Sequence, residues 1–217
     1  MTTAAPDPFS EAFQAELARL FRLRRDVRRF RPDPVDPEVV DALLVEAGFA
    51  PSVGLSEPWR YVLVESANAR AAVRAEFERC NAEALAGYDG DDARLYASLK
   101  LAGLDEAPVQ LAVFCEAEDG KGRGLGVGTM PEMRVYSVVC SIMLLWLSAR
   151  ARGLGLGWVS ILHPETIAVA VGAAAHWSLV AYLCLGWPAE EHADPELERA
   201  GWERREGIAD RVFRAKR

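Results

Sequence analysis

The spacing of apolar residues predicts two helices in the first quarter of the chain. Residues 9–23 carry apolar side chains at helical intervals. A second helix should begin at Pro37, with Asp36 as its N-cap, and should run to about Phe49. Between them lies a turn interrupted by prolines, and a loop rich in Pro, Ser and Gly follows at residues 50–59.

Beyond this loop, strand and helix patterns alternate. Short apolar runs predict four strands, at residues 60–65, 109–115, 156–162 and 179–185. Helical spacing predicts helices over residues 67–85, 93–101 and 131–152. The last of these helices is apolar on nearly all sides, so we expect it to be buried in the core or against a second subunit. Its apolar stretch, residues 135–147, is shorter than the roughly 18 residues that a membrane span needs, so we expect no membrane anchor.

The sequence predicts one α+β domain. It has no internal repeat and no clear linker, and 217 residues suit a single core. We expect residues 1–10 to form a short disordered lead-in and residues 11–217 to form the domain. The charged tail from Glu190 holds Trp202 and Phe213, which would be unusual in a disordered end. We therefore expect it to pack across the domain or onto a partner chain.

Composition narrows the class of protein. With 51% hydrophobic and 26% charged residues and a formal charge of −7, the chain is typical of soluble globular proteins, and it is too acidic for a general nucleic-acid or anionic-membrane binder. The N-terminus lacks the features of a secretory signal, which favours a cytoplasmic protein. The four cysteines form no CxxC pair, and three of them lie in apolar runs, where we expect reduced core residues.

Several common kinds of site are disfavoured. A dinucleotide fingerprint lies between a strand and a following helix, whereas the glycines at residues 153–157 lie between a helix and a strand. We expect a tight turn there and a flexible loop at residues 122–128. His163, His176 and His192 have no metal-ligand spacing, so no metal site is predicted, and no GxSxG motif indicates a hydrolase.

An arginine-rich run at residues 24–30 carries the strongest chemical signal. It sets one carboxylate, Asp26, among four guanidinium groups. Arg24, Arg25 and Arg28 offer forked donors suited to a phosphate, with the carboxylate held beside it. The alternative is a solvated basic helix end, because charge runs usually face water.

Two further segments decide how that run is interpreted. The loop at residues 50–60 offers hydroxyls and backbone amides, and the strand that starts at Gly157 contains Trp158 and Ser160. Beside a phosphate cluster, such groups suit a flat cofactor with polar edges. Taken alone, the loop is a turn in which Trp59 covers the core, and Ser160 is one hydroxyl in an apolar strand.

Together these segments resemble the nitroreductase-like flavoproteins, and within them one branch in which reduced FMN is the substrate. The similarity extends over nearly the whole chain from about residue 20. The segments that carry it are residues 24–30, 51–59, 128–132, 146–162, 182–186 and 201–205. Ordinary members of the family usually have Ser in place of Asp26 and Asn in place of Ser56, so the chain departs from them where the branch does.

The resemblance implies a fold, an assembly and a reaction. The fold is a central mixed, mostly antiparallel sheet flanked by helices, and the assembly is a homodimer with FMN at its interface. In the reaction, O2 adds to reduced FMN, which breaks down to 5,6-dimethylbenzimidazole, the lower ligand of vitamin B12, and erythrose 4-phosphate, among other fragments. One ribityl carbon enters the new imidazole ring. A separate flavin reductase is expected to supply the reduced FMN.

The resemblance also implies site residues. Asp26 is expected to act as base and then acid near the ribityl carbon, kept ionised by its arginine neighbours. Ser160 is expected to hydrogen-bond near the flavin. The late phosphate-binding residue is Arg205, with Arg204 as the alternative because an alignment of the tail can slip by one position. The expected FMN-binding residues are Arg24, Arg25, Asp26, Val27, Arg28, Ser52, Trp158, Val159, Ser160 and Arg205.

Two other functions remain open from the sequence. One is an NAD(P)H-dependent nitroreductase or a dehalogenase-like flavoprotein that recycles an intact FMN. The other is a flavin-binding protein without chemistry.

Overall fold

The computed structural model describes residues 8–116 and 120–215. The predicted lead-in at residues 1–10 therefore lies largely outside the described residues. The helices are α1 (Glu11–Leu23), α2 (Pro37–Ala47), α3 (Ala67–Leu85), α4 (Gly90–Ser98), α5 (Met133–Ala151), α6 (Pro164–Ala170) and α7 (Glu196–Arg199), with short 3-10 turns at Val53–Leu55 and Ala209–Arg211. The strands are β1 (Trp59–Leu63), β2 (Val109–Glu116), β3 (Gly155–Val159) and β4 (Trp177–Gly186).

The four strands form one sheet in the order β1-β2-β4-β3, and each neighbouring pair is antiparallel. A register shift between Val113 and Phe114 in β2 bends its pairing with β4. Beyond the edge strand β3, an isolated parallel bridge joins Asp26 to Leu156. The four-stranded sheet is therefore antiparallel, and the mixed character that the resemblance implied is confined, among the described residues, to this bridge at its edge.

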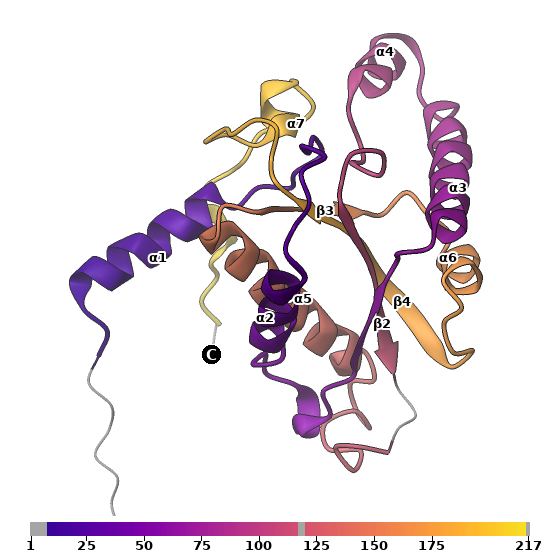
Figure 1. Cartoon of the computed structure of the whole chain (residues 1–217). Helices are drawn as coiled ribbons and strands as arrows, with labels where there is room; N and C mark the ends of the chain where they lie inside the picture. The colour runs from indigo at the N-terminus through magenta and orange to yellow at the C-terminus, as the bar shows by residue number, and fades with distance from the viewer. Residues whose placement is uncertain (1–7, 117–119, 216–217) are drawn as a thin grey trace, which may run out of the picture.

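Helices cover both faces of the sheet (Figure 1). On one face, α2 and α5 pack against strand residues such as Leu111 and Leu183. On the other face, α3 and α6 contribute Val73 and Ile167 to a second cluster that surrounds Tyr182. The three layers bury the sheet on both faces. The segment that contains Asp26 lies against its open edge, beside β3.

Local sequence accounts for most helix starts and ends. Asp36 accepts the backbone N–H of Glu38 at 2.9 Å and caps α2, as predicted. Ser66 caps α3 in the same way, through the N–H of Ala69. After α5, Gly153 adopts a φ of 78°, which favours glycine, and this confirms the tight turn into β3.

Some expectations about these elements were wrong. Strand β3 ends at Val159 instead of residue 162, and the short helix α6, which follows it closely, was not predicted. Its seven residues are too few for a periodic pattern to stand out from the apolar run before them. Cys80, Cys115 and Cys184 are buried, but Cys140 in the apolar run of α5 is exposed.

Helix α5 is buried on one side only. Ile142, Leu145 and other residues on that side lie in the core, whereas Tyr136, Val139 and Met143 are exposed. By length and hydropathy α5 would also suit a membrane span, a property that core helices of soluble proteins share. Its inner side packs on the sheet, and its outer side exposes apolar side chains.

Candidate active site

The arginine-rich segment follows α1 and runs along the outer edge of β3. The N–H of Val27 donates to the carbonyl oxygen of Leu156 at 3.1 Å. A Cβ on Gly157 would collide with the carbonyl oxygen of Val27, so glycine is required there for the two backbones to approach. The alternating glycines of β3 therefore hold the arginine-rich segment against the sheet, a role that the sequence pattern did not indicate.

Asp26 is fixed by both of its carboxylate oxygens. Oδ1 accepts the backbone N–H of Trp158 at 2.8 Å, and Oδ2 accepts Nε of Arg28 at 3.0 Å. Arg28 also donates to the carbonyl oxygen of Lys100 at 3.1 Å. The Asp26 side chain keeps 31% of its surface exposed, so the carboxylate is held firmly and still faces solvent.

Four arginines surround one hollow of about 150 Å³ next to this carboxylate. Arg24, Arg25, Arg28 and Arg205 line it together with Asp26 and part of α7. Burial lowers the pKa of Arg24, and the charge of Arg205 lowers it further against the opposing effect of Asp26. Burial also lowers the pKa of Arg25, with Arg205 and Arg24 adding to the effect. The cations repel one another, so a bound anion would stabilise them.

An aromatic contact near Arg205 holds the C-terminal tail against the rest of the protein. The ring of Trp202 lies edge-on to Tyr88 and Tyr96, with centroid distances of 5.6 and 6.1 Å. This fixes the tail three residues before Arg205, which lines the hollow. Arg204 and Arg205 are both exposed, but of the two only Arg205 lines the hollow. The geometry therefore brings Arg205, and not its neighbour, to the cluster.

Trp146 of α5 is a further member of the site. The guanidinium of Arg24 lies over its ring at 4.8 Å from the centroid, and its Nε1 donates to the carbonyl oxygen of Arg25 at 3.1 Å. These contacts join α5 to the arginine-rich segment. The similarity segment at residues 146–162 begins at this tryptophan, but spacing alone did not assign it a role.

The remaining predicted site residues take different positions. Trp158 is half-buried, with its ring 6.5 Å from that of Trp146. The side chain of Val159 is only 4% exposed and packs in the core, so side-chain contact with a ligand is not available to it. Ser160 follows the end of β3 and is exposed. The hydroxyl of Ser52 accepts the N–H of Glu57 at 3.1 Å and thereby closes its own loop.

Two of the three histidines are paired with carboxylates across the fold, which their spacing in the sequence did not reveal. His163 Nδ1 lies 2.8 Å from Glu76 Oε1, and His176 Nε2 lies 3.0 Å from Glu116 Oε1. Neither pair contains a residue of the arginine-lined hollow.

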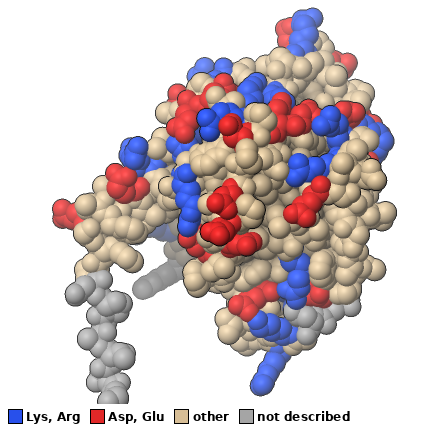
Figure 2. Space-filling model, viewed as in Figure 1, with Lys and Arg blue, Asp and Glu red and all other residues tan. Residues whose placement is uncertain are grey.

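The hollow fits the phosphate end of FMN. Nε of Arg25 is buried and has no hydrogen-bond partner among the described residues, and a phosphate oxygen would supply the missing acceptor. Figure 2 shows basic and acidic side chains intermingled over the face of the molecule that it draws, and the whole chain has a formal net charge of −7. The crowding of arginines is thus local, as expected for the recognition of a small anion.

Comparison with known proteins identifies the family of this chain. The Nitroreductase family model matches residues 22–187. The 5,6-dimethylbenzimidazole synthase of Rhodospirillum rubrum is 55% identical over 197 residues, 91% of this chain and 93% of its own length. The enzyme of the same name from Rhodobacter capsulatus is 45% identical over 195 residues, 90% of this chain and 94% of its own length.

Solved structures share the fold. The crystal structure of oxidized iodotyrosine deiodinase bound to FMN and 3-iodo-L-tyrosine superposes with a TM-score of 0.68, covering 81% of this chain and 91% of that one. The identity is 24%, so this likeness establishes the architecture alone.

Proposed function

The chain belongs to the nitroreductase family, and from this premise we propose that it is a 5,6-dimethylbenzimidazole synthase that consumes reduced FMN and O2. The observation that carries the proposal is the placement of Asp26, a carboxylate held on β3 at the rim of an arginine-lined hollow. The high identity to synthases of this name over about nine-tenths of the chain supports the same conclusion.

The proposed roles follow from the contacts of each side chain. Arg24, Arg25 and Arg28, with Arg205 from the tail, bind the phosphate. This anchors one end of the ribityl chain beside Asp26. Val27 contributes through its backbone contact with β3, and Ser52 contributes by ordering its loop.

Asp26 is proposed to carry the protons of the reaction. Reduced FMN supplies the electrons and the carbon skeleton, and breaking the ribityl chain requires protons to be removed and returned. The carboxylate is oriented by the Trp158 N–H and by Arg28, so its position does not depend on the ligand. Ser160, exposed at the end of β3, is proposed to hydrogen-bond at the flavin edge, with Trp158 beside it. Val159 is proposed to take part only through its backbone.

The first test is a product assay. The protein is mixed in air with FMN and a flavin reductase that keeps the flavin reduced. We expect the total flavin, measured by its absorbance after full reoxidation, to fall as 5,6-dimethylbenzimidazole forms in a one-to-one ratio. Sustained consumption of reductant with FMN intact would instead indicate a flavin-recycling oxidoreductase. Bound FMN without any turnover would indicate a flavin-binding protein.

We propose that the protein acts as a cytoplasmic homodimer joined through the outer side of α5. Tyr136, Val139 and Met143 form an exposed apolar strip on this helix, and α1, which has no buried residue, extends from the body beside it (Figure 1). Such surface is usually covered by a partner.

Sedimentation should therefore give about twice the chain mass of 23.8 kDa, and Val139→Glu should reduce it to that of a single chain. The control is Glu83→Gln, on an exposed side chain of α3, which should leave the mass doubled. A wild-type protein that sediments as a monomer at micromolar concentration would contradict the dimer.

A further inference from the structure

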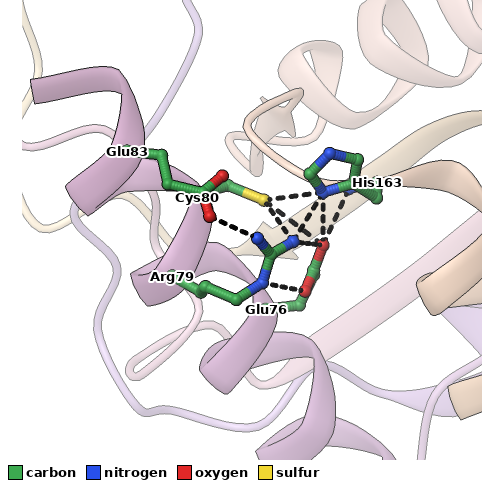
Figure 3. Close-up of polar contacts among 5 residues, drawn as sticks. All are labelled: Glu76, Arg79, Cys80, Glu83 and His163. Atoms are coloured by element: carbon green, nitrogen blue, oxygen red, sulfur yellow. Dashed lines mark hydrogen bonds and ion pairs between the residues drawn. The ribbon is translucent and has the colours of Figure 1, made fainter. Parts of the chain in front are cut away.

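A polar cluster joins α3 to the loop that follows β3 (Figure 3), with Glu76 and Cys80 buried and the side chain of His163 exposed. Glu76 and Cys80 lie one turn apart on α3, and His163 is the residue that directly precedes α6. Glu76 Oε1 accepts the backbone N–H of His163 at 3.1 Å and lies 2.8 Å from its Nδ1. The Cys80 thiol donates to the same oxygen at 3.2 Å.

Glu76 is a charged group inside the protein. The residue is 6% exposed, and Arg79 binds both of its oxygens, at 2.7 and 3.1 Å. Hydrogen bonds from Arg79 lower the pKa of Glu76 to about 2, against the opposing effect of burial, and His163 adds to the lowering. A buried carboxylate with this many donors is costly to remove or misplace. The cluster therefore holds His163 in place.

The donor set of Glu76, Cys80 and His163 would also suit a metal ion, but its geometry argues against one. Tetrahedral zinc places neighbouring nitrogen and oxygen ligands about 3.4 Å apart. Here Oε1 and Nδ1 are 2.8 Å apart, and Sγ and Nδ1 are 3.1 Å apart. Nη2 of Arg79 lies 2.7 Å from both Oε1 and Nδ1. A cation already caps the face that a metal would need.

The contact to His163 fixes one end of a very short loop. At its other end, Val159 is paired with Tyr182 in the sheet. Ser160, Ile161 and Leu162 are the only residues between these two points. Three residues held at both ends have few conformations, so the direction of the Ser160 side chain depends on where His163 is held.

We infer that Glu76 is a positioning residue for Ser160, acting through the backbone N–H of His163. The inference rests on the proposed function, in which Ser160 hydrogen-bonds at the flavin edge, and it adds that this bond steers the reaction of the flavin with oxygen. If Ser160 moves, reduced FMN and O2 give oxidised FMN and hydrogen peroxide in place of 5,6-dimethylbenzimidazole, a two-electron oxidation that leaves the flavin whole. Glu76 therefore controls how the flavin is partitioned between the two outcomes.

The test compares three variants with the wild type. Glu76→Ala removes the acceptor, and Glu76→Gln retains an oxygen that can face His163. Glu83→Gln neutralises a second carboxylate that binds Arg79, at 2.6 Å, and that does not touch the loop. For each variant we measure the Kd for FMN, the melting temperature, and the yields of 5,6-dimethylbenzimidazole and hydrogen peroxide at saturating reduced FMN.

Glu76→Ala should lower the 5,6-dimethylbenzimidazole yield about tenfold and raise peroxide correspondingly, while the Kd for FMN stays within about twofold because the phosphate site is elsewhere. Glu76→Gln should keep at least half of the wild-type yield, and Glu83→Gln should keep all of it. A purely structural role would lower the melting temperature and leave the ratio of the two products unchanged.

Three results would overturn the inference. The first is an unchanged product ratio in Glu76→Ala, and the second is a Glu76→Gln yield as low as that of Glu76→Ala. The third is a wild-type yield that falls on adding EDTA and returns with Zn²⁺, since the cluster would then be a metal site. If the wild type itself makes no 5,6-dimethylbenzimidazole, the proposed function fails instead, so the two failures are distinguishable.

Discussion

Replacing Asp26 by Asn is expected to abolish formation of 5,6-dimethylbenzimidazole while FMN remains bound. The amide oxygen can still accept the Trp158 N–H that now binds Oδ1 at 2.8 Å, so the segment should keep its position on β3. The variant loses the proton-transferring group, an effect worth roughly 10²- to 10⁴-fold in rate. Removing a negative charge beside the arginines should not weaken phosphate binding. Single-turnover product formation and FMN titration measure the two effects separately.

Asp33→Asn is the matched control for this variant. Asp33 lies in the same part of the chain, but its side chain is more than half exposed and pairs with Arg31. It should retain wild-type turnover. Full activity in Asp26→Asn would exclude Asp26 as the proton carrier. Loss of FMN binding in that variant would show that its role is to anchor the segment.

Replacing Arg205 by Gln should weaken FMN binding by roughly ten- to a hundredfold, because one charge-assisted hydrogen bond to the phosphate contributes about 1.5–3 kcal/mol. The side chain lines the same hollow as Arg24, Arg25 and Arg28. Its charge also lowers the pKa of Arg24 and Arg25, so in the free protein these cations repel one another. The Kd measured by flavin fluorescence should rise, whereas turnover at saturating FMN should change less.

The adjacent Arg204→Gln is the control, with the same loss of charge one position away. Its side chain does not line the hollow, so its Kd should stay near that of the wild type. If Arg204→Gln weakens binding and Arg205→Gln does not, the tail is bound to the flavin in a register shifted by one residue.

Elements with strong local signals could be predicted from the sequence. Helix α3 has its predicted bounds, residues 67–85, because a capping serine and helical spacing agree along its whole length. The early arginine cluster was also evident, since Arg24, Arg25 and Arg28 are neighbours in the chain. The end of β3 and the short helix α6 could not be predicted, because both depend on how the chain turns toward α3.

Long-range contacts limited the prediction of the site. The choice of Arg205 over Arg204 rests on Trp202 packing against Tyr88 and Tyr96, more than 100 residues away in the chain. The pairing of His163 with Glu76 also joins distant parts of the chain, 87 residues apart. Consecutive strand residues point to opposite faces, so Trp158 and Val159 do not both present side chains to one ligand.

The central claim is that FMN is broken down, and labelling its ribityl chain tests this most directly. FMN with carbon-13 at all five ribityl carbons is reduced and mixed with the protein in air. The masses of the products are then measured by mass spectrometry. The account predicts 5,6-dimethylbenzimidazole heavier by one mass unit and erythrose 4-phosphate heavier by four. FMN recovered with all five labels after many equivalents of reductant have been oxidised would contradict it.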